Sequence, residues 1–103
     1  MCSSDLGTLV TVRSSAIERG TRFDLNAKAV TVGRAASNDI RLANDEFASG
    51  SHARIEPRRD GVWVEDIGST NGTYVNGTRL GRAHKLVPGD VVRVGETDLR
   101  YET

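Results

Sequence analysis

The chain has 103 residues, and its fourteen acidic and fourteen basic side chains give a formal net charge of zero. That length fits one domain whose core can be stable without a metal ion, and the single cysteine has no internal partner for a disulfide. The neutral balance excludes an overall field that would recruit nucleic acid or an anionic membrane, so any anion site must be local.

The amino end differs from the rest of the chain. Cys-Ser-Ser-Asp-Leu at positions 2–6 is what a common sequencing adaptor encodes when it is translated, and a natural disordered start is the alternative. We therefore expect residues 1–7 to be a disordered or artefactual segment and residues 8–103 to form the domain.

Short β-branched runs with alternating apolar residues predict strands along the whole chain. In chain order, the expected strands are residues 9–13, 22–25, 29–32, 40–42, 53–56, 62–67, 74–75, 78–80, 91–94 and 97–101. Residues 57–61 and Asn76-Gly77 read as hairpin turns, and residues 86–90 as a turn around Pro88. No stretch keeps a helical period, so the sequence predicts an all-β sandwich.

The sequence gives different expectations for where two aromatic side chains lie. Phe47, in a polar stretch, is expected to pack inward and anchor the loop that follows it. Trp63 fits either the core or the outer face of a sheet, and its pattern does not decide between them.

Three polar clusters separate the central strands. They are Gly33-Arg34 with Ser37-Asn38-Asp39 behind, Ser49-Gly50-Ser51-His52, and Gly68-Ser69-Thr70-Asn71-Gly72. A guanidinium, hydroxyls, an amide and glycines that bring backbone N–H groups close are suited to a phosphate. Loops that gather at one end of a sheet would therefore make a phosphate site.

The ordered set of Gly33-Arg34, Ser49 with His52, and Asn71-Gly72 resembles the forkhead-associated (FHA) domain, a phosphothreonine-binding module. The likeness continues through Asn76-Gly77, residues 86–90 and Val94-Gly95. It implies about eleven mostly antiparallel strands in a sandwich with the ligand loops at one apex. The Arg-rich composition and residues 45–49 are similar to small actinobacterial FHA proteins linked to Ser/Thr kinase signalling.

The resemblance implies a role for each site residue. Arg34, Ser49 and Thr70 match positions that contact the phosphate, and Asn71 matches one that holds the main chain of the ligand. Ordinary surface, loop-capping and turn roles are the alternatives for these residues. His52 matches a structural histidine that fixes the Ser49 loop.

Further glycines complete the expected site. Gly33 and Gly72 are given structural roles by the same resemblance. Gly50 departs from the pattern, because many FHA domains carry Arg or Lys directly after the serine. Its N–H can contact the phosphate instead, or a neighbouring cation such as Arg54 or Arg79 can act with Arg34.

These residues favour a non-catalytic reader of phosphothreonine on partner proteins, such as a Ser/Thr kinase or its substrates. The alternative is an FHA-like scaffold that binds through a sheet face without phosphate. No nucleophile elbow, P-loop or dinucleotide motif is present, and two histidines and one cysteine show no metal-ligand spacing, so we expect no catalytic residue, metal or cofactor.

The same features predict where the domain works and with what. We expect a monomeric domain that contacts neither nucleic acid nor membrane. No apolar run approaches the roughly 20 residues of a spanning helix, and the lack of a disulfide framework favours the cytoplasm. A natural protein that continues upstream of residue 7 can still carry a membrane anchor.

Overall fold

The computed structural model describes residues 7–14, 16–25 and 28–102, and within them the chain is all-β. Residues 1–6 of the expected amino-terminal segment lie outside the described part. Gly7 is buried, and its carbonyl accepts a hydrogen bond from the Leu25 N–H (2.9 Å), so Gly7 belongs to the fold.

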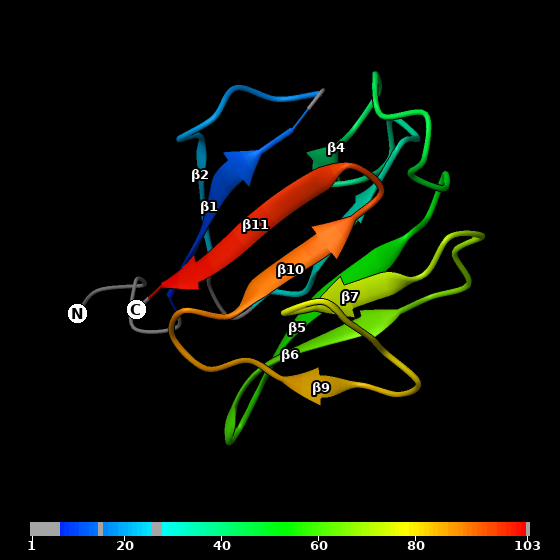
Figure 1. Cartoon of the computed structure of the whole chain (residues 1–103). Coiled ribbons are helices and arrows are strands. Elements are labelled where there is room, and N and C mark those ends of the chain that lie inside the picture. The colour runs from blue at the N-terminus through cyan, green and yellow to red at the C-terminus, as the bar shows by residue number, and fades with distance from the viewer. Residues whose placement is uncertain (1–6, 15, 26–27, 103) are drawn as a thin grey trace.

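Eleven strands of the described chain form two sheets that pack face to face (Figure 1). One sheet has the order β2-β1-β11-β10-β7-β8, and the other β4-β3-β5-β6-β9. The strands are β1 Thr8–Arg13, β2 Arg22–Asp24, β3 Val30–Gly33, β4 Ile40–Arg41, β5 Ala53–Arg58, β6 Gly61–Asp66, β7 Thr73–Val75, β8 Thr78–Arg79, β9 His84–Lys85, β10 Val91–Val94 and β11 Thr97–Glu102. Every assigned pair is antiparallel except β3 with β4. The predicted sandwich is confirmed.

The core follows from the period of two along the strands. Thr97, Leu99 and Tyr101 of β11 are buried, while Arg100, which alternates with them, is exposed and Asp98 is half-buried. The same alternation in β6 buries Val62 and leaves Trp63 on the outside. The inner faces together form one apolar core between the sheets.

Trp63 lies on the outer face of the second sheet, not in the core. Its Nε1 donates to Asp60 Oδ1 (3.0 Å), and the Arg58 guanidinium lies 4.8 Å from the centre of its ring. The hydrogen bond from Trp63 lowers the pKa of Asp60 below its ordinary value.

The structure corrects the expectation for Phe47. Its side chain is 51% exposed and does not enter the core. The loop is anchored instead by its neighbours Asp45, which is fully buried, and Ala48, which is 4% exposed.

Two smaller differences concern the strands. β5 runs through Pro57 to Arg58, where residues 57–61 were expected to form the turn, because Pro57 still pairs in register with Val62. His84, which no expected strand includes, lies in the short strand β9, and its Nε2 is 3.6 Å from Asp90 Oδ2. The Asn76-Gly77 hairpin turn is confirmed, with both residues at positive φ.

Candidate functional site

Three loops meet at one end of the sandwich, at the upper right of Figure 1. They join β3 to β4, β4 to β5, and β6 to β7. Between them lies an open hollow of about 680 Å³. It is lined by Arg34, Ala35, Glu46, Phe47, Ala48, Ser49, Gly50, Thr70 and Asn71. The structure thus brings all five predicted ligand-contacting residues together.

Arg34 supplies the positive charge of this hollow. It follows Gly33 at the end of β3, and its backbone N–H donates to the Ser49 carbonyl (2.9 Å). The exposed guanidinium has one weak contact, from Nη1 to the Glu46 carbonyl at 3.5 Å. Most of its donors are therefore free for a ligand, and among the described lining residues Arg34 is the one cation.

Ser49 and Thr70 are joined by a hydrogen bond across two loops. The Thr70 N–H donates to Ser49 Oγ (3.0 Å), so the hydroxyl hydrogen of Ser49 is left to donate elsewhere. This bond also commits the backbone N–H of Thr70. The hydroxyl is the group that Thr70 can still offer to a ligand.

The buried side chain of His52 hydrogen-bonds to the same two loops. The Ser49 N–H donates to Nδ1 (3.0 Å), so the other ring nitrogen, Nε2, must carry the proton and donate to the Gly72 carbonyl (2.9 Å). The ring is fully buried and both nitrogens are used. The His52 side chain therefore links the loop that contains Ser49 to the segment that contains Gly72.

Glycine is required at Gly33 and at Gly72 for different physical reasons, and it is not required by space at Gly50. A Cβ at Gly33 would collide with the Gly50 carbonyl oxygen, because the two loops touch there. Gly72 has φ +87°, and a Cβ there would lie 2.7 Å from Arg79 Nε. A Cβ at Gly50 would meet only Ala35 Cβ, at 4.0 Å, so space does not require a glycine at this position.

Arg54 and Arg79 are the cations that could replace the Arg or Lys that many FHA domains carry at the position of Gly50. Arg54 forms an ion pair with Glu65 (2.8 Å), and Arg79 packs over Gly72; neither lines the hollow. Gly50 does line it. Of the alternatives left open by the sequence, Gly50 is the one that lies at the hollow.

Asn71 holds the loop that contains Phe47. Its Nδ2 donates to the Phe47 carbonyl (2.8 Å), which leaves its Oδ1 and a second N–H for the main chain of a ligand. The site residue is therefore also a structural one.

Sequence reasoning missed three residues that position these loops. Asn38 is 9% exposed, and its Nδ2 donates to the Ala35 carbonyl (2.9 Å) and the Gly50 carbonyl (2.6 Å). The fully buried Asp45 accepts from the Phe47 N–H (3.0 Å) and from Thr97 Oγ1 (2.9 Å). Each joins parts of the chain that no local pattern connects.

Asp66 is the third missed residue, and it organises the loop after β6. Its carboxylate accepts from the N–H groups of Gly68 (2.9 Å) and Ser69 (3.0 Å), the Ser69 hydroxyl and the Thr73 hydroxyl (2.9 Å). Burial raises the pKa of Asp66, but these hydrogen bonds outweigh it and lower the pKa to about 2. Asp followed closely by Gly and Ser is a turn signal that could have identified it.

Within residues 7–14, 16–25 and 28–102, no group of three or more His, Cys, Asp or Glu is placed to hold a metal ion. The same ranges contain no helix of the length and apolarity needed to cross a membrane.

A family model described as the FHA domain matches residues 30–95, and the chain therefore belongs to the FHA family. The FHA domain-containing protein FhaB of Mycolicibacterium smegmatis is 44% identical over 78 residues, which are 76% of this chain and 50% of FhaB. The ABC transporter ATP-binding/permease protein Rv1747 of Mycobacterium tuberculosis is 42% identical over 78 residues, or 9% of that protein. The chain thus spans about half the length of the FhaB proteins it matches.

Solved structures share both fold and sequence with this chain. An FHA domain studied for phosphothreonine-dependent interactions superposes with a TM-score of 0.80 and 28% identity, covering 93% of this chain and 94% of that one. EmbR of Mycobacterium tuberculosis, in complex with a low-affinity phosphopeptide, gives 0.82 and 28% over 93% of this chain and 24% of EmbR. The FhaA FHA domain, bound to the intracellular domain of Rv3910, gives 0.79 and 28% over 92% and 98%.

Proposed function

We propose that this domain is a non-catalytic module that binds phosphothreonine on partner proteins. The observation that carries the proposal is the single open hollow in which Arg34, Ser49, Gly50 and Thr70 face a common space. The family relationship and the phosphothreonine-dependent binding of a structural relative support it.

The chemistry of each group fits a phosphate ester. A phosphothreonine carries close to two negative charges near neutral pH and three strong acceptor oxygens. The planar fork of Arg34 can donate to two of them, and the hydroxyl of Ser49 to the third. The Gly50 N–H and the Thr70 hydroxyl add donors without adding charge. Glu46 also lines the hollow, but it is exposed and its charge is screened by solvent and salt.

Asn71 extends the proposal from the phosphate to the peptide. With Nδ2 donating to the Phe47 carbonyl, Oδ1 can accept an N–H from the ligand main chain. This contact would distinguish an extended phosphopeptide from free phosphate. Gly33, Gly72 and His52 would act only by holding the loops in place.

The partners in this proposal are proteins that carry phosphothreonine, a Ser/Thr kinase or its substrates among them. The complex of EmbR with a low-affinity phosphopeptide and that of the FhaA FHA domain with the intracellular domain of Rv3910 support protein partners of this kind. The proposal takes the domain to act as a monomer in the cytoplasm, and light scattering on the purified chain tests its monomeric state.

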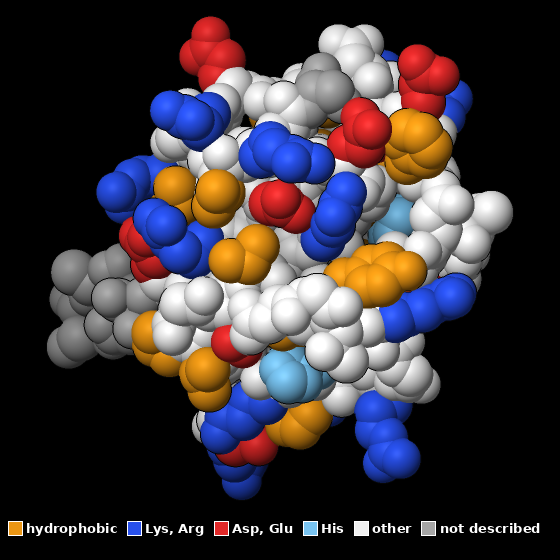
Figure 2. Space-filling model, viewed as in Figure 1, with side chains coloured by type: hydrophobic (Ala, Val, Ile, Leu, Met, Phe, Trp, Pro, Cys, Tyr) orange, Lys and Arg blue, Asp and Glu red, His pale blue; other side chains and the backbone are white. Residues whose placement is uncertain are grey.

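A scaffold that binds through a sheet face is the competing function. Figure 2 shows the outer face of the sheet that contains β1, β11 and β10, where side chains of both charges alternate with separate apolar ones. Arg100 pairs there with Glu102 (2.6 Å). Because this face has no broad apolar area in that view, it offers less to a partner than the hollow at the loops.

The test is a titration of phosphothreonine peptides from a library, each compared with its unphosphorylated form. We expect phosphate-dependent binding, and we expect Arg34→Ala to weaken it at least a hundredfold, because about 3 kcal/mol of charge-assisted hydrogen bonding is lost. Gly50→Arg is expected to have the opposite effect on affinity. It should strengthen binding about tenfold, since Gly50 is exposed, has an ordinary φ and has room for a side chain.

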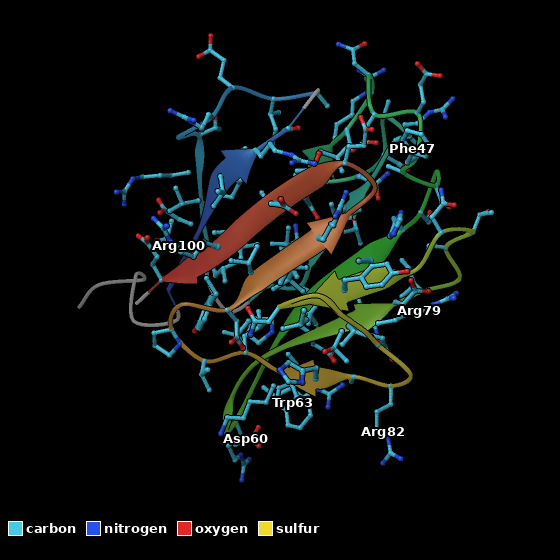
Figure 3. All side chains as sticks on the ribbon, viewed as in Figure 1. Phe47, Asp60, Trp63, Arg79, Arg82 and Arg100 are labelled. Carbon is cyan, nitrogen blue, oxygen red and sulfur yellow. The ribbon has the colours of Figure 1, made fainter. Side chains whose placement is uncertain are left out.

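Arg82→Ala serves as the matched control, because Arg82 is an exposed arginine outside the hollow (Figure 3). Its affinity should equal that of the unaltered domain. The proposal fails if no peptide binds in a phosphate-dependent way, or if binding survives both phosphatase treatment and Arg34→Ala.

A further inference from the structure

Asp45 is a buried carboxylate that the proposed phosphate contacts do not use. It is fully buried, and its oxygens accept from the Phe47 N–H (3.0 Å), the Glu96 N–H (2.8 Å) and the Thr97 hydroxyl (2.9 Å). Burying a carboxylate is costly unless donors of this kind surround it. The carboxylate therefore holds its three donors in place, and these donors come from two segments that are far apart in the chain.

One of these segments forms much of the phosphate hollow. Residues 46–50, directly after Asp45, supply five of the nine residues that line it. The other segment is the turn between β10 and β11, where Gly95 has φ +63° and a Cβ would lie 2.6 Å from Asp45 Oδ1. The same Cβ would lie 2.8 Å from the Ala48 nitrogen. Glycine at position 95 therefore lets the turn approach the loop, and Asp45 joins the two.

Ser14 extends these contacts to the connection between β1 and β2. Its Oγ lies 2.8 Å from Thr97 Oγ1. Because the Thr97 hydroxyl hydrogen is donated to Asp45, Ser14 must donate its own hydrogen to the Thr97 oxygen. Ser14 Oγ in turn accepts from the N–H groups of Ala16 (2.9 Å) and Ile17 (3.1 Å). A hydrogen-bonded relay thus runs from Ser14 through Thr97 to Asp45.

The relay crosses the loop end of the first sheet. β1 and β11 are neighbours in this sheet, and Arg13 pairs with Asp98 (Figure 1). The next residues along the two strands are Ser14 and Thr97, which therefore lie opposite each other. Ser14 does not line the hollow. Linked hydrogen bonds polarise and strengthen one another, so loss of the outermost hydroxyl also weakens the contact at the carboxylate.

We infer that Ser14 is a positioning residue of the phosphate site, although it does not line the hollow. It acts through Thr97 and Asp45 on residues 46–50. The inference rests on the proposed function, because affinity for a phosphothreonine peptide is the property that it affects. Loss of the relay removes no group that faces the ligand but lets residues 46–50 move relative to Arg34. Binding should therefore weaken without the loss of any ligand contact from the chain.

The experiment measures phosphothreonine-peptide affinity by fluorescence anisotropy in variants of the relay. Thr97→Val removes the hydroxyl next to Asp45 and keeps the shape of the side chain, and we expect affinity to fall about tenfold. Ser14→Ala removes the outer hydroxyl and should lower affinity about three- to fivefold, the scale of one neutral hydrogen bond. Thr97→Ser keeps a hydroxyl and should stay within about twofold of the unaltered domain.

The double variant tests whether the two hydroxyls act in one relay. In a Thr97→Val background, Ser14→Ala should lower affinity further by less than about twofold, because the link to Asp45 is already broken. Independent effects would multiply instead. The amide NMR signals of Phe47 and Ser49 supply a second readout that needs no ligand. Both signals should shift in each single variant that breaks the relay.

Thr78→Val is the matched control for loss of a threonine hydroxyl, because Thr78 is exposed on β8 and lies outside the hollow. Val62→Ala is the control for lost stability, since Val62 is buried in the core at the start of β6. Both variants should bind the phosphopeptide within about twofold of the unaltered domain and leave the Phe47 and Ser49 amide signals in place.

Unchanged affinity or unmoved amide signals in Thr97→Val and Ser14→Ala would overturn the inference while phosphate-dependent binding remained. So would fully multiplicative effects in the double variant, or a loss in Thr97→Ser or Val62→Ala equal to that in Thr97→Val. Absence of phosphate-dependent binding for every peptide would overturn the proposed function. The amide signals of Phe47 and Ser49 would then still decide whether the relay positions the loop.

Discussion

The interior of the sandwich and its loop end are held together by different physical means. Between the sheets, buried side chains such as Leu9, Val92 and Leu99 are apolar and pack by shape. At the loop end several buried side chains are polar, among them Asn38, Asp45 and His52, and each hydrogen-bonds to a distant segment, as His52 does to Gly72. The first region needs apolar residues of about the right volume, whereas the second needs particular donors opposite particular acceptors.

This difference predicts separable defects. A substitution in the interior should change the free energy of unfolding and leave the geometry of the hollow intact. A substitution among the loop-end hydrogen bonds should change ligand affinity as well. The following predictions run from the largest expected effect to the smallest.

Leu99→Ala tests the interior. Leu99 is fully buried on β11, so the change should lower the free energy of unfolding by about 3 to 4 kcal/mol, the usual cost of the lost burial and the cavity. Urea denaturation measures this. Well below the melting temperature, phosphopeptide affinity should stay within about twofold. An affinity loss as large as that of Arg34→Ala would show that the two regions are not separable.

His52→Ala tests the loop end. The Ser49 N–H and the Gly72 carbonyl would lose their partner, and we expect a loss of about 2 to 3 kcal/mol in the free energy of unfolding. Phosphopeptide affinity should fall about tenfold or more, because Ser49 is no longer held beside Thr70. Calorimetry and peptide titration measure the two effects.

His84→Ala is the control for this variant. His84 is exposed and lies 3.6 Å from Asp90, so both quantities should change by less than about 0.5 kcal/mol. If His52→Ala destabilised the domain without weakening peptide binding, its positioning role would be wrong.

Acid should loosen the loop that Asp66 organises. The folded pKa of Asp66 is about 2, below the ordinary value of 3.8, so the carboxylate stabilises the fold above pH 3.8. That contribution is lost as the pH falls through about 2, and we expect it to be of the order of 1 kcal/mol for this partly exposed group. Urea midpoints measured across this range should fall more steeply than in Asp66→Asn.

The comparison with Asp66→Asn is needed because the pKa of Asp90 is lowered as well. Burial raises that pKa, but hydrogen bonds from the Val87 N–H and the Asn76 side chain, together with His84, outweigh it. Asp90 remains in both proteins, so only the difference between the two slopes reports on Asp66. Equal slopes would contradict the assignment.

The strands could be predicted because their information is local. Alternation along β1 and β11 and the Asn76-Gly77 turn are visible in a few consecutive residues. The short strand β9 escaped prediction because His84 and Lys85 are both exposed and pair with β6 only at an edge. Two residues give no period to detect.

The site could be predicted only in part. Arg34, Ser49, Thr70 and Asn71 were recognised by their resemblance to a family, and the structure brings them together. Phe47 was misjudged because an isolated apolar residue in a polar loop is usually buried. Here Asp45, two residues earlier, takes the buried position, and its partners Glu96 and Thr97 are about fifty residues further along the chain.

The pairing of Thr8 with Glu102 brings both ends of the described fold together. β11 starts next to Glu96, whose N–H donates to Asp45 at the loop end, and runs to Glu102, a span of roughly 17 to 20 Å at the usual rise of an extended strand. A linker, fusion partner or surface tether joined at either end would thus leave from the pole remote from the loops. The hollow between the loops lies at the other end of the sandwich from both attachment points, so a sensor surface or a fused module joined there would not cover it.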